Sequence, residues 1–333
     1  MAELTYRSAV AHGIAQEMRR DPSLVMLGED IGPAGGVFKT TVGLWDEFGP
    51  DRVRDTPISE QAILGAAMGA AMTGIPVVAE IMFSDFLPVC FDILSNEIAK
   101  TRYMSNGQLA VPLVVRCANG SGVRFGAQHS QSLENWCMMV PGLKVVAPST
   151  PVDMVGLMAA AIRDPDPVVL FEHKSLMASK GEVPDGEVLD TLGTARTVRP
   201  GTDVTIVALA LMVPRALEAA EILAQQGISA EVIDLRSLVP LDMASILESV
   251  QRTSRLVTVE ENPRLCGWGA EVASIVAHEG FWDLDGPVLR VTTPHVPLPA
   301  ADVLEDEAVP SVDRIVDTIR ANWDYDAAPA EPK

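Results

Sequence analysis

Two side chains in this sequence have surroundings suited to proton transfer, and the first is Glu60. It stands in DTPISEQAILGAAMGAAMTG, Asp55–Gly74, where Ser59 can cap a helix whose following residues are almost all apolar. A carboxylate at the start of such a helix is costly to bury without a partner, and burial favours its protonated form. Acids are also common in first helical turns, where the helix dipole contributes only ~0.3–1 kcal/mol. The residues alone leave both interpretations open.

The second candidate is His129, in the loop ANGSGVRFGAQHSQ, 118–131. Its neighbours are polar or glycine, a setting that suits a ligand-facing proton carrier better than a core histidine. The alternative is a loop histidine held by local hydrogen bonds. His12, His173, His278 and His295 have no comparable surroundings and are interpreted as structural.

The same loop carries glycines at 120, 122 and 126 after a predicted strand, so a dinucleotide-binding turn has to be considered. The spacing G-x-G-x-x-x-G departs from that fingerprint. The next predicted strand also ends in Val146-Ala147-Pro148, where a ribose-binding acid is expected. A nicotinamide-dependent dehydrogenase is therefore a weak alternative.

The elements that position these residues alternate between strand and helix, which predicts a parallel sheet with helices on both faces. The first strand stops at Gly28-Glu29-Asp30 and so delivers two acids at its end. Strands are predicted at 24–27, 76–82, 112–116, 142–146 and 168–171, and helices at 5–19, from 60 onward, 86–103 and 151–163.

A polar, turn-rich stretch at 177–202 marks a domain boundary, and a second α/β unit follows it. We expect domains at 1–185 and 186–323 and a disordered tail at 324–333. The second unit has predicted strands at 204–209, 230–235, 256–260 and 288–291, and predicted helices at 214–226, 243–250, 269–278 and 315–323.

Composition limits the partners. The 333 residues include 25 basic and 45 acidic ones, a formal net charge of −20, which opposes binding to nucleic acid or anionic lipid. The sequence has no apolar run long enough to cross a bilayer and no signal-like N-terminus. Its four cysteines form no CxxC pair, so reduced thiols and a cytoplasmic location are expected.

Several short motifs occur together and in order. They are GEDI at 28–31, GV at 36–37, DTPISE at 55–60, AEIMF at 79–83, AQHSQ at 127–131, PGLKVV at 141–146 and EVIDLR at 231–236. From Thr5 to Ala321 the chain resembles the beta subunit of the thiamine-diphosphate-dependent 2-oxo acid dehydrogenase component. The resemblance implies an α/β fold in which a pyrimidine-binding domain precedes a transketolase C-terminal-type domain.

The resemblance also implies roles for individual residues. Glu60 matches the glutamate that hydrogen-bonds a ring nitrogen of the cofactor's aminopyrimidine, and Phe86 matches an aromatic residue that packs on that ring. Glu29 is similar to an acid near the cofactor, in a proton path between paired sites. His129 looks like the active-site histidine that handles substrate protons or acyl transfer to lipoamide. For Phe86, ordinary core packing remains the alternative.

The family's diphosphate-and-magnesium motif, GDG followed by paired asparagines, is absent from this sequence. The resemblance therefore implies half an active site, completed by an alpha subunit that binds magnesium, in a heterotetramer of two alpha and two beta subunits. It also implies a lipoyl-bearing dihydrolipoyl acyltransferase as the acceptor of the acyl group.

A potassium site is known in related beta subunits and would map to one cluster of positions here. An ordinary helix-to-strand turn is the alternative, because carbonyl ligands leave little sequence trace, and Pro165-Asp166 stands where an asparagine often closes the site. The mapped residues are Leu113, Ala161, Ile162, Asp164 and Asp166.

The substrate is predicted to be pyruvate or a close 2-oxo acid, with acetoin second. The segments 83–86, 172–176 and 181–184 are similar to those of acetoin dehydrogenase beta subunits as well as to those of pyruvate and branched-chain enzymes. A non-catalytic scaffold subunit is the alternative from another class.

Overall fold

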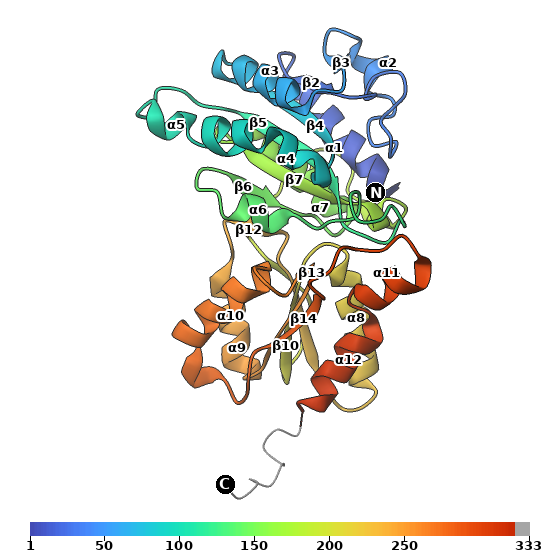
Figure 1. Cartoon of the computed structure of the whole chain (residues 1–333), viewed down its shortest axis with the longest axis vertical. Helices are drawn as coiled ribbons and strands as arrows, with labels where there is room; N and C mark the ends of the chain where they lie inside the picture. The colour runs from blue at the N-terminus through green and yellow to red at the C-terminus, as the bar shows by residue number, and fades with distance from the viewer. Residues whose placement is uncertain (324–333) are drawn as a thin grey trace, which may run out of the picture. The chain divides into compact units, whose positions relative to one another are not determined.

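The computed structural model describes residues 1–323, and these fold into two compact units (Figure 1). The first unit contains Met1–Thr194 and Arg236–Leu241, and the second contains Ala195–Leu235 and the chain from Asp242 onward. The tail predicted at 324–333 lies outside the described residues.

The first unit is built on a seven-stranded sheet in the order β12-β6-β7-β5-β4-β2-β3. Its pairs are parallel except β12–β6, so the carboxyl ends of the parallel strands meet at one edge. Its central strands are buried along their whole length, as expected where helices cover both faces. The strands are β2 (Val25–Gly28), β3 (Val53–Asp55), β4 (Val77–Phe83), β5 (Leu113–Asn119), β6 (Lys144–Val146), β7 (Val168–His173) and β12 (Ser237–Val239).

Helices flank this sheet on both sides in Figure 1. The Thr5 side chain caps the first helix by accepting from Ser8 N, and Thr150 caps α7 in the same way. The helical segments are α1 (Tyr6–Arg20), α2 (Leu44–Phe48), α3 (Glu60–Met72), η1 (Ser84–Phe86), α4 (Leu87–Asp92), η2 (Ile93–Ile98), α5 (Thr101–Met104), α6 (Glu134–Met138), α7 (Pro151–Arg163) and η3 (Lys174–Leu176). A two-stranded antiparallel sheet joins β1 (Ala2–Thr5) to β8 (Lys180–Val183).

The single helix predicted at 86–103 is wrong, because the structure divides it into shorter pieces. Pro88 stands in the first turn of α4, where its fixed φ and missing N–H are tolerated. Further along, η2 is a π-helical turn that ends where Ala99 N donates to Leu94 O at 3.1 Å. The piece just before α4 places Phe86 beside the end of β4.

Glu17 joins α1 to α7 through ion pairs. It is fully buried and accepts from Arg163 Nε at 2.9 Å and Arg20 Nε at 2.6 Å. Burial alone would raise the pKa of Glu17, but hydrogen bonds from Arg163, Gln16 and Arg20 outweigh it and lower the pKa. Glu17→Ala removes the carboxylate that these two partly exposed arginines share, and we expect a loss of about 2 kcal/mol in the free energy of unfolding.

Chemical denaturation at pH 7 measures this loss. Exposed Glu3→Ala is the control, expected within about 0.5 kcal/mol of wild type. Because the pKa of Glu17 is lowered in the fold, its contribution is present above the carboxyl's ordinary pKa and is lost as pH falls below it. Equal losses for the two variants would contradict the assignment.

The second unit has a five-stranded sheet in the order β14-β13-β10-β11-β9, in which only the β11–β9 pair is antiparallel. In Figure 1, α9 and α10 lie on one side of this sheet and α8 and α12 on the other. Its strands are β9 (Arg196–Arg199), β10 (Val204–Ala208), β11 (Ala230–Asp234), β13 (Leu256–Pro263) and β14 (Leu289–Thr293). Its helices are α8 (Met212–Ala224), α9 (Met243–Thr253), α10 (Trp268–Glu279), η4 (Phe281–Asp283), α11 (Asp302–Ala308) and α12 (Val312–Ala321).

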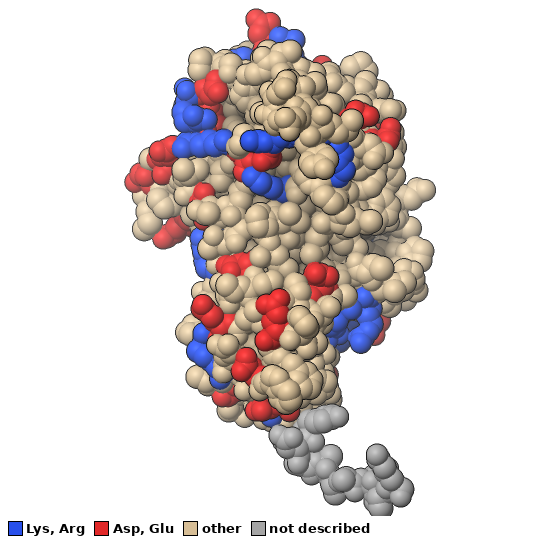
Figure 2. Space-filling model, turned by 90° about the vertical axis from the view of Figure 1, so that its left-hand side faces the viewer, with Lys and Arg blue, Asp and Glu red and all other residues tan. Residues whose placement is uncertain are grey.

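The surface carries both signs of charge. On the face shown in Figure 2, acidic and basic side chains are interspersed. No helix within residues 1–323 combines the length and the apolar character needed to cross a bilayer.

Candidate active site

Two acids, Glu29 and Glu60, follow β2 and β3, paired strands whose carboxyl ends meet at one edge of the first sheet. Glu29 follows the last residue of β2 and is 7% exposed, and Glu60 opens α3 and is 8% exposed. Burial, together with the charges of Glu60 and Asp30, raises the pKa of Glu29. Gly28 pairs with Asp55 where β2 and β3 end, and the charge of Glu60 acts on Glu29, so we refer to these two buried acids as the acid pair.

Glu60 differs from a helix acid that faces solvent. Ser59 occupies the N-cap position, as predicted, but its side chain makes no capping hydrogen bond. Burial and the charge of Glu60 raise the pKa of the thiol of Cys90, a residue of α4, to about 12. Both acids are themselves largely shielded from water, an environment typical of acids at functional sites.

An aromatic cluster surrounds the second predicted residue, His129. Its ring lies 4.9 Å from the Phe83 ring and 5.3 Å from the Phe86 ring, edge to face in both cases. Phe38 and Phe125 pack on Phe83 from the other side, at 5.4 and 6.0 Å. The structure thus brings Phe86 and His129 together.

The backbone of the His129 loop is held by the segment that follows β7. Lys174, 3% exposed, donates from Nζ to the His129 carbonyl oxygen at 2.6 Å and lies 5.1 Å over the Phe83 ring. At the loop's start, Gly120 has φ +84°, and an added Cβ would lie 2.1 Å from His173 Nε2. Only glycine fits there, so this glycine serves a close approach of two chain segments.

Several buried polar atoms near these residues have no partner within the described part of the chain. They are Thr56 Oγ1, Asp85 Oδ2 and Ser130 Oγ. The other Asp85 oxygen accepts from Gln131 N at 3.2 Å and Nε2 at 2.8 Å. Buried groups left unpaired are rare in folded proteins and indicate a missing ligand or subunit. Acids, aromatic rings and unpaired polar atoms together fit a flat, polar heteroaromatic ring.

The predicted potassium ligands lie where α7 turns toward β7. Lys144 Nζ contacts both oxygens of Asp164, at 2.7 and 2.6 Å, and Arg102 donates to Asp166 Oδ1 at 2.8 Å. Both carboxylates are therefore paired with cationic side chains, which leaves backbone carbonyl oxygens as the candidate ligands for potassium. The other positions of this set are Leu113, at the start of β5, and Ala161 and Ile162, near the end of α7. Residues 1–323 contain no cluster of three or more His, Cys, Asp or Glu that could hold a metal.

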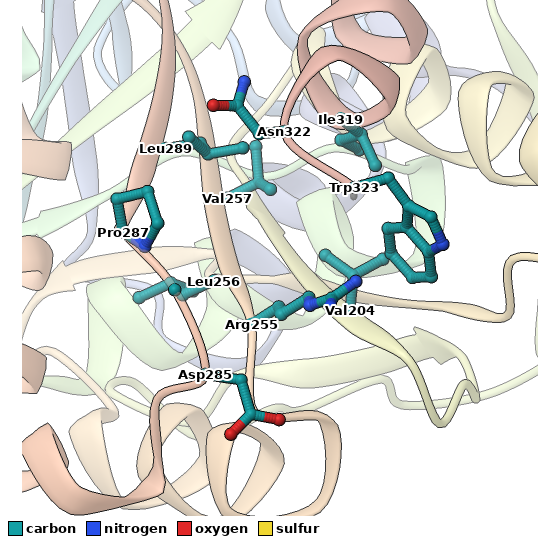
Figure 3. Close-up of a pocket in the computed structure, with 11 residues that line it drawn as sticks. Val204, Arg255, Leu256, Val257, Asp285, Pro287, Leu289, Ile319, Asn322 and Trp323 are labelled. Carbon is teal, nitrogen blue, oxygen red and sulfur yellow. The ribbon is translucent and has the colours of Figure 1, made fainter. Parts of the chain in front are cut away.

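The second unit has a small pocket of its own at the amino ends of β10, β13 and β14 (Figure 3). Arg255 lies 4.3 Å over the Trp323 ring at its wall. The pocket has a volume of about 20 Å³, enough for roughly one water molecule. It is too small for a cofactor.

Sequence reasoning missed Lys174 and a buried ionic group formed by Glu80, Arg116 and Glu172. The available signal was a charged residue within each of three strongly apolar strands, PVVAEIM, PLVVR and VVLFEH. Such residues are almost never fully buried unless paired, so their pairing could have been expected. Their partners could not be identified without the strand order.

The fold and the site define a transketolase-type protein. The chain matches the transketolase pyrimidine-binding domain over residues 2–180 and the transketolase C-terminal domain over 193–315. A solved structure described as a split-gene transketolase, inactive beta4 tetramer, superimposes with a TM-score of 0.79 at 24% identity, over 96% of this chain and 97% of that one. These matches confirm the predicted fold class.

Within that class, the chain belongs to the family of dehydrogenase E1 beta subunits. It is 48% identical to the acetoin:2,6-dichlorophenolindophenol oxidoreductase subunit beta of Cupriavidus necator, over 96% of this chain and 97% of that one. It is 47% identical to a mitochondrial pyruvate dehydrogenase E1 beta subunit of Oryza sativa subsp. japonica, over 94% of this chain and 85% of the relative. It is 42% identical to the 2-oxoisovalerate dehydrogenase subunit beta of Bacillus subtilis, over 96% of this chain and 98% of the relative. The resemblance stated from the motifs is confirmed.

Proposed function

We propose that this chain is the beta subunit of a thiamine-diphosphate-dependent enzyme that oxidatively decarboxylates pyruvate or a related 2-oxo acid and passes the acyl group to lipoamide. The observation that carries the proposal is the buried Glu29–Glu60 pair in the pyrimidine-binding domain that also holds the His129–Phe83–Phe86 cluster. This combination supplies proton exchange, an aromatic wall and a histidine within one compact unit.

Glu60, Glu29 and Phe86 are the residues that would hold the aminopyrimidine of the cofactor. When bound, thiamine diphosphate supplies a nucleophilic carbon for the substrate carbonyl and accepts the electrons released on decarboxylation. Glu60 is the proposed proton carrier, in a site that is largely closed to water. Glu29 disfavours a second negative charge beside it, and Phe86 presents an apolar face.

His129 is proposed to handle protons of the substrate or of the lipoyl thiol. Its ring is fixed between Phe83 and Phe86, and its backbone is fixed by Lys174. A histidine oriented in this way can act as a general acid or base at one defined position.

The proposed partners follow from what the chain lacks. Without a GDG motif and paired asparagines, it needs an alpha subunit for the diphosphate and magnesium, in a heterotetramer of two alpha and two beta subunits. A lipoyl-bearing dihydrolipoyl acyltransferase is the proposed acyl acceptor. The free cysteines of the described chain support the proposed cytoplasmic location.

Substrate choice is tested by co-expressing the chain with an alpha subunit that carries the diphosphate motif. Turnover of pyruvate, 2-oxoisovalerate and acetoin is then compared with 2,6-dichlorophenolindophenol as acceptor. We expect kcat/KM to be highest for pyruvate or a close 2-oxo acid, and we expect no turnover by the beta chain alone. Preference for acetoin would support the second candidate, which the 48% identity to an acetoin-oxidising relative favours. Inactivity with every substrate in a complex that binds the cofactor would favour the scaffold, and micromolar NADH binding would favour a nicotinamide enzyme.

We also propose a potassium site at Leu113, Ala161, Ile162, Asp164 and Asp166, which acts through backbone carbonyls. A cation that binds only the folded state raises the melting temperature by mass action, and we expect about 3 °C in 100 mM K⁺ relative to 100 mM Na⁺. Thermal unfolding of the complex in the two salts measures it. Equal melting temperatures would contradict this site without affecting the proposed activity.

A further inference from the structure

Three charged residues form a buried ionic group on neighbouring strands of the first sheet. Arg116 on β5 donates from Nε to Glu172 Oε1 at 2.5 Å and from Nη2 to Glu172 Oε2 at 2.7 Å, and from Nη1 to Glu80 Oε2. Glu80 lies on β4 directly opposite Arg116, and Glu172 lies on β7. Arg116, Glu80 and Glu172 are only 2%, 7% and 1% exposed, respectively.

Such a group is a poor way to stabilise a core. Desolvating three charges costs several kcal/mol per ion, and apolar replacements of buried ion pairs are often neutral or stabilising. Two carboxylates also face a single guanidinium, so the group carries excess negative charge when both are ionised. Its composition indicates a use other than packing.

The ionic group lies next to the end of β2, the strand that leads into Glu29. β2 and β4 are paired with Leu27 opposite Ala79, so the next residues along, Gly28 and Glu80, lie side by side. An added Cβ on Gly28 would lie 2.8 Å from Glu80 Cβ. Glu80 is therefore separated from the acid pair by a glycine, the residue that leaves no side chain between them.

The same arginine holds the loop that follows Glu29. Arg116 Nη2 donates to Thr40 Oγ1 at 2.8 Å, and Thr40 is 2% exposed. This loop carries Phe38, whose ring packs on Phe83 of the aromatic cluster. Arg116 thus links two segments near the site: β4, through Glu80, and the loop that carries Phe38, through Thr40.

We propose that Glu80, Arg116 and Glu172 are positioning residues that fix the Thr40 loop beside the cofactor site. This inference rests on the proposed function and deepens it. The charged groups that act on Glu80 include Arg116, Glu172 and Glu29.

The electrostatics agree with this arrangement. Burial raises the pKa of Glu80 to about 7, which Arg116 opposes and which Glu172 and Glu29 increase. Glu80 can therefore gain or lose a proton near neutral pH. Ionised Glu80 binds the Arg116 guanidinium more strongly than protonated Glu80 does, so the hold of Arg116 on Thr40 strengthens as pH rises through 7.

The test is Glu80→Gln in the assembled complex, with Glu260→Gln as a matched control. Glu260 is also buried and paired with an arginine, Arg290, and burial raises its pKa too, but it lies in the second unit. For Glu80→Gln we expect the dissociation constant of thiamine diphosphate to rise about fivefold at pH 8, where wild-type Glu80 is ionised and pairs with Arg116, and to stay near the wild-type value at pH 6, where Glu80 is protonated. For Glu260→Gln we expect wild-type dissociation constants at both pH values.

A second readout needs no cofactor. The folded pKa of Glu80 lies above the ordinary value of 4.5, so its contribution to stability is full below pH 4.5 and is lost as pH rises through 7. The melting temperature of Glu80→Gln should therefore rise relative to wild type between pH 5 and pH 8. Wild-type dissociation constants for thiamine diphosphate at both pH 6 and pH 8 in a folded Glu80→Gln complex overturn the proposal.

If Glu80→Gln does not fold, Thr40→Val decides. It removes the hydroxyl that Arg116 donates to, without changing charge, and should weaken thiamine diphosphate binding about fivefold to tenfold. A wild-type dissociation constant overturns the proposal. A wild-type complex without turnover would instead refute the proposed function, and the dissociation constants would still decide the positioning role.

Discussion

Glu60→Gln is expected to lower kcat of the assembled complex by at least about 10²-fold, the usual contribution of a positioned acid or base. Glutamine keeps the size of the side chain and one acceptor oxygen but cannot exchange a proton. Because Glu60 is 8% exposed and lies beside Glu29, water cannot easily replace that function. Steady-state turnover with 2,6-dichlorophenolindophenol measures the effect.

Two controls separate chemistry from folding. Glu305→Gln replaces another fully buried acid in a first helical turn, that of α11, and should keep wild-type turnover. The dissociation constant for thiamine diphosphate, measured on the same Glu60→Gln protein, shows whether binding or turnover is lost. Wild-type turnover in Glu60→Gln would support the scaffold alternative.

His129→Gln is expected to lower the overall reaction with lipoamide by about 10²-fold, because a positioned general acid or base contributes that much. The ring lies between Phe83 and Phe86, and Lys174 holds its carbonyl, so glutamine cannot reproduce its position or its titration. The dye-coupled reaction, which bypasses lipoamide, identifies the step. A loss confined to lipoamide assigns acyl transfer to His129, and an equal loss in both assays assigns substrate protons.

The control for His129→Gln is His278→Gln, on exposed α10 surface in the second unit, which should leave both assays unchanged. If His129→Gln also leaves both unchanged, its ring only fills space in the aromatic cluster.

Much of the scaffold was predictable because its signals are local. Apolar runs bounded by turn residues located the strands that became β2, β4, β5 and β7, and an amphipathic pattern located α1. The interruption of 86–103 by a π-helical turn and by the turn at 99–100 was not predictable from apolar periodicity, because a π-helical turn keeps the same residues apolar. The edge strands β1, β3, β8 and β9 escaped notice because they are short and partly exposed.

The site was only partly predictable, because it depends on strand order. Glu29 and Glu60 were each identified from sequence, but they come together only because β2 lies beside β3, the strand that leads into α3. The same order joins Glu80, Arg116 and Glu172 across three strands. The return of Arg236–Leu241 to the first sheet as β12 is likewise a long-range pairing. Spacing along the chain carries no record of such contacts.

The measurement that tests the central claim most directly is an experimental structure of the alpha–beta complex with thiamine diphosphate bound. The account predicts a Glu60 carboxylate oxygen within hydrogen-bond distance, about 2.6–3.2 Å, of a pyrimidine ring nitrogen, with Phe86 against the ring. A pyrimidine ring out of contact with Glu60 would contradict it.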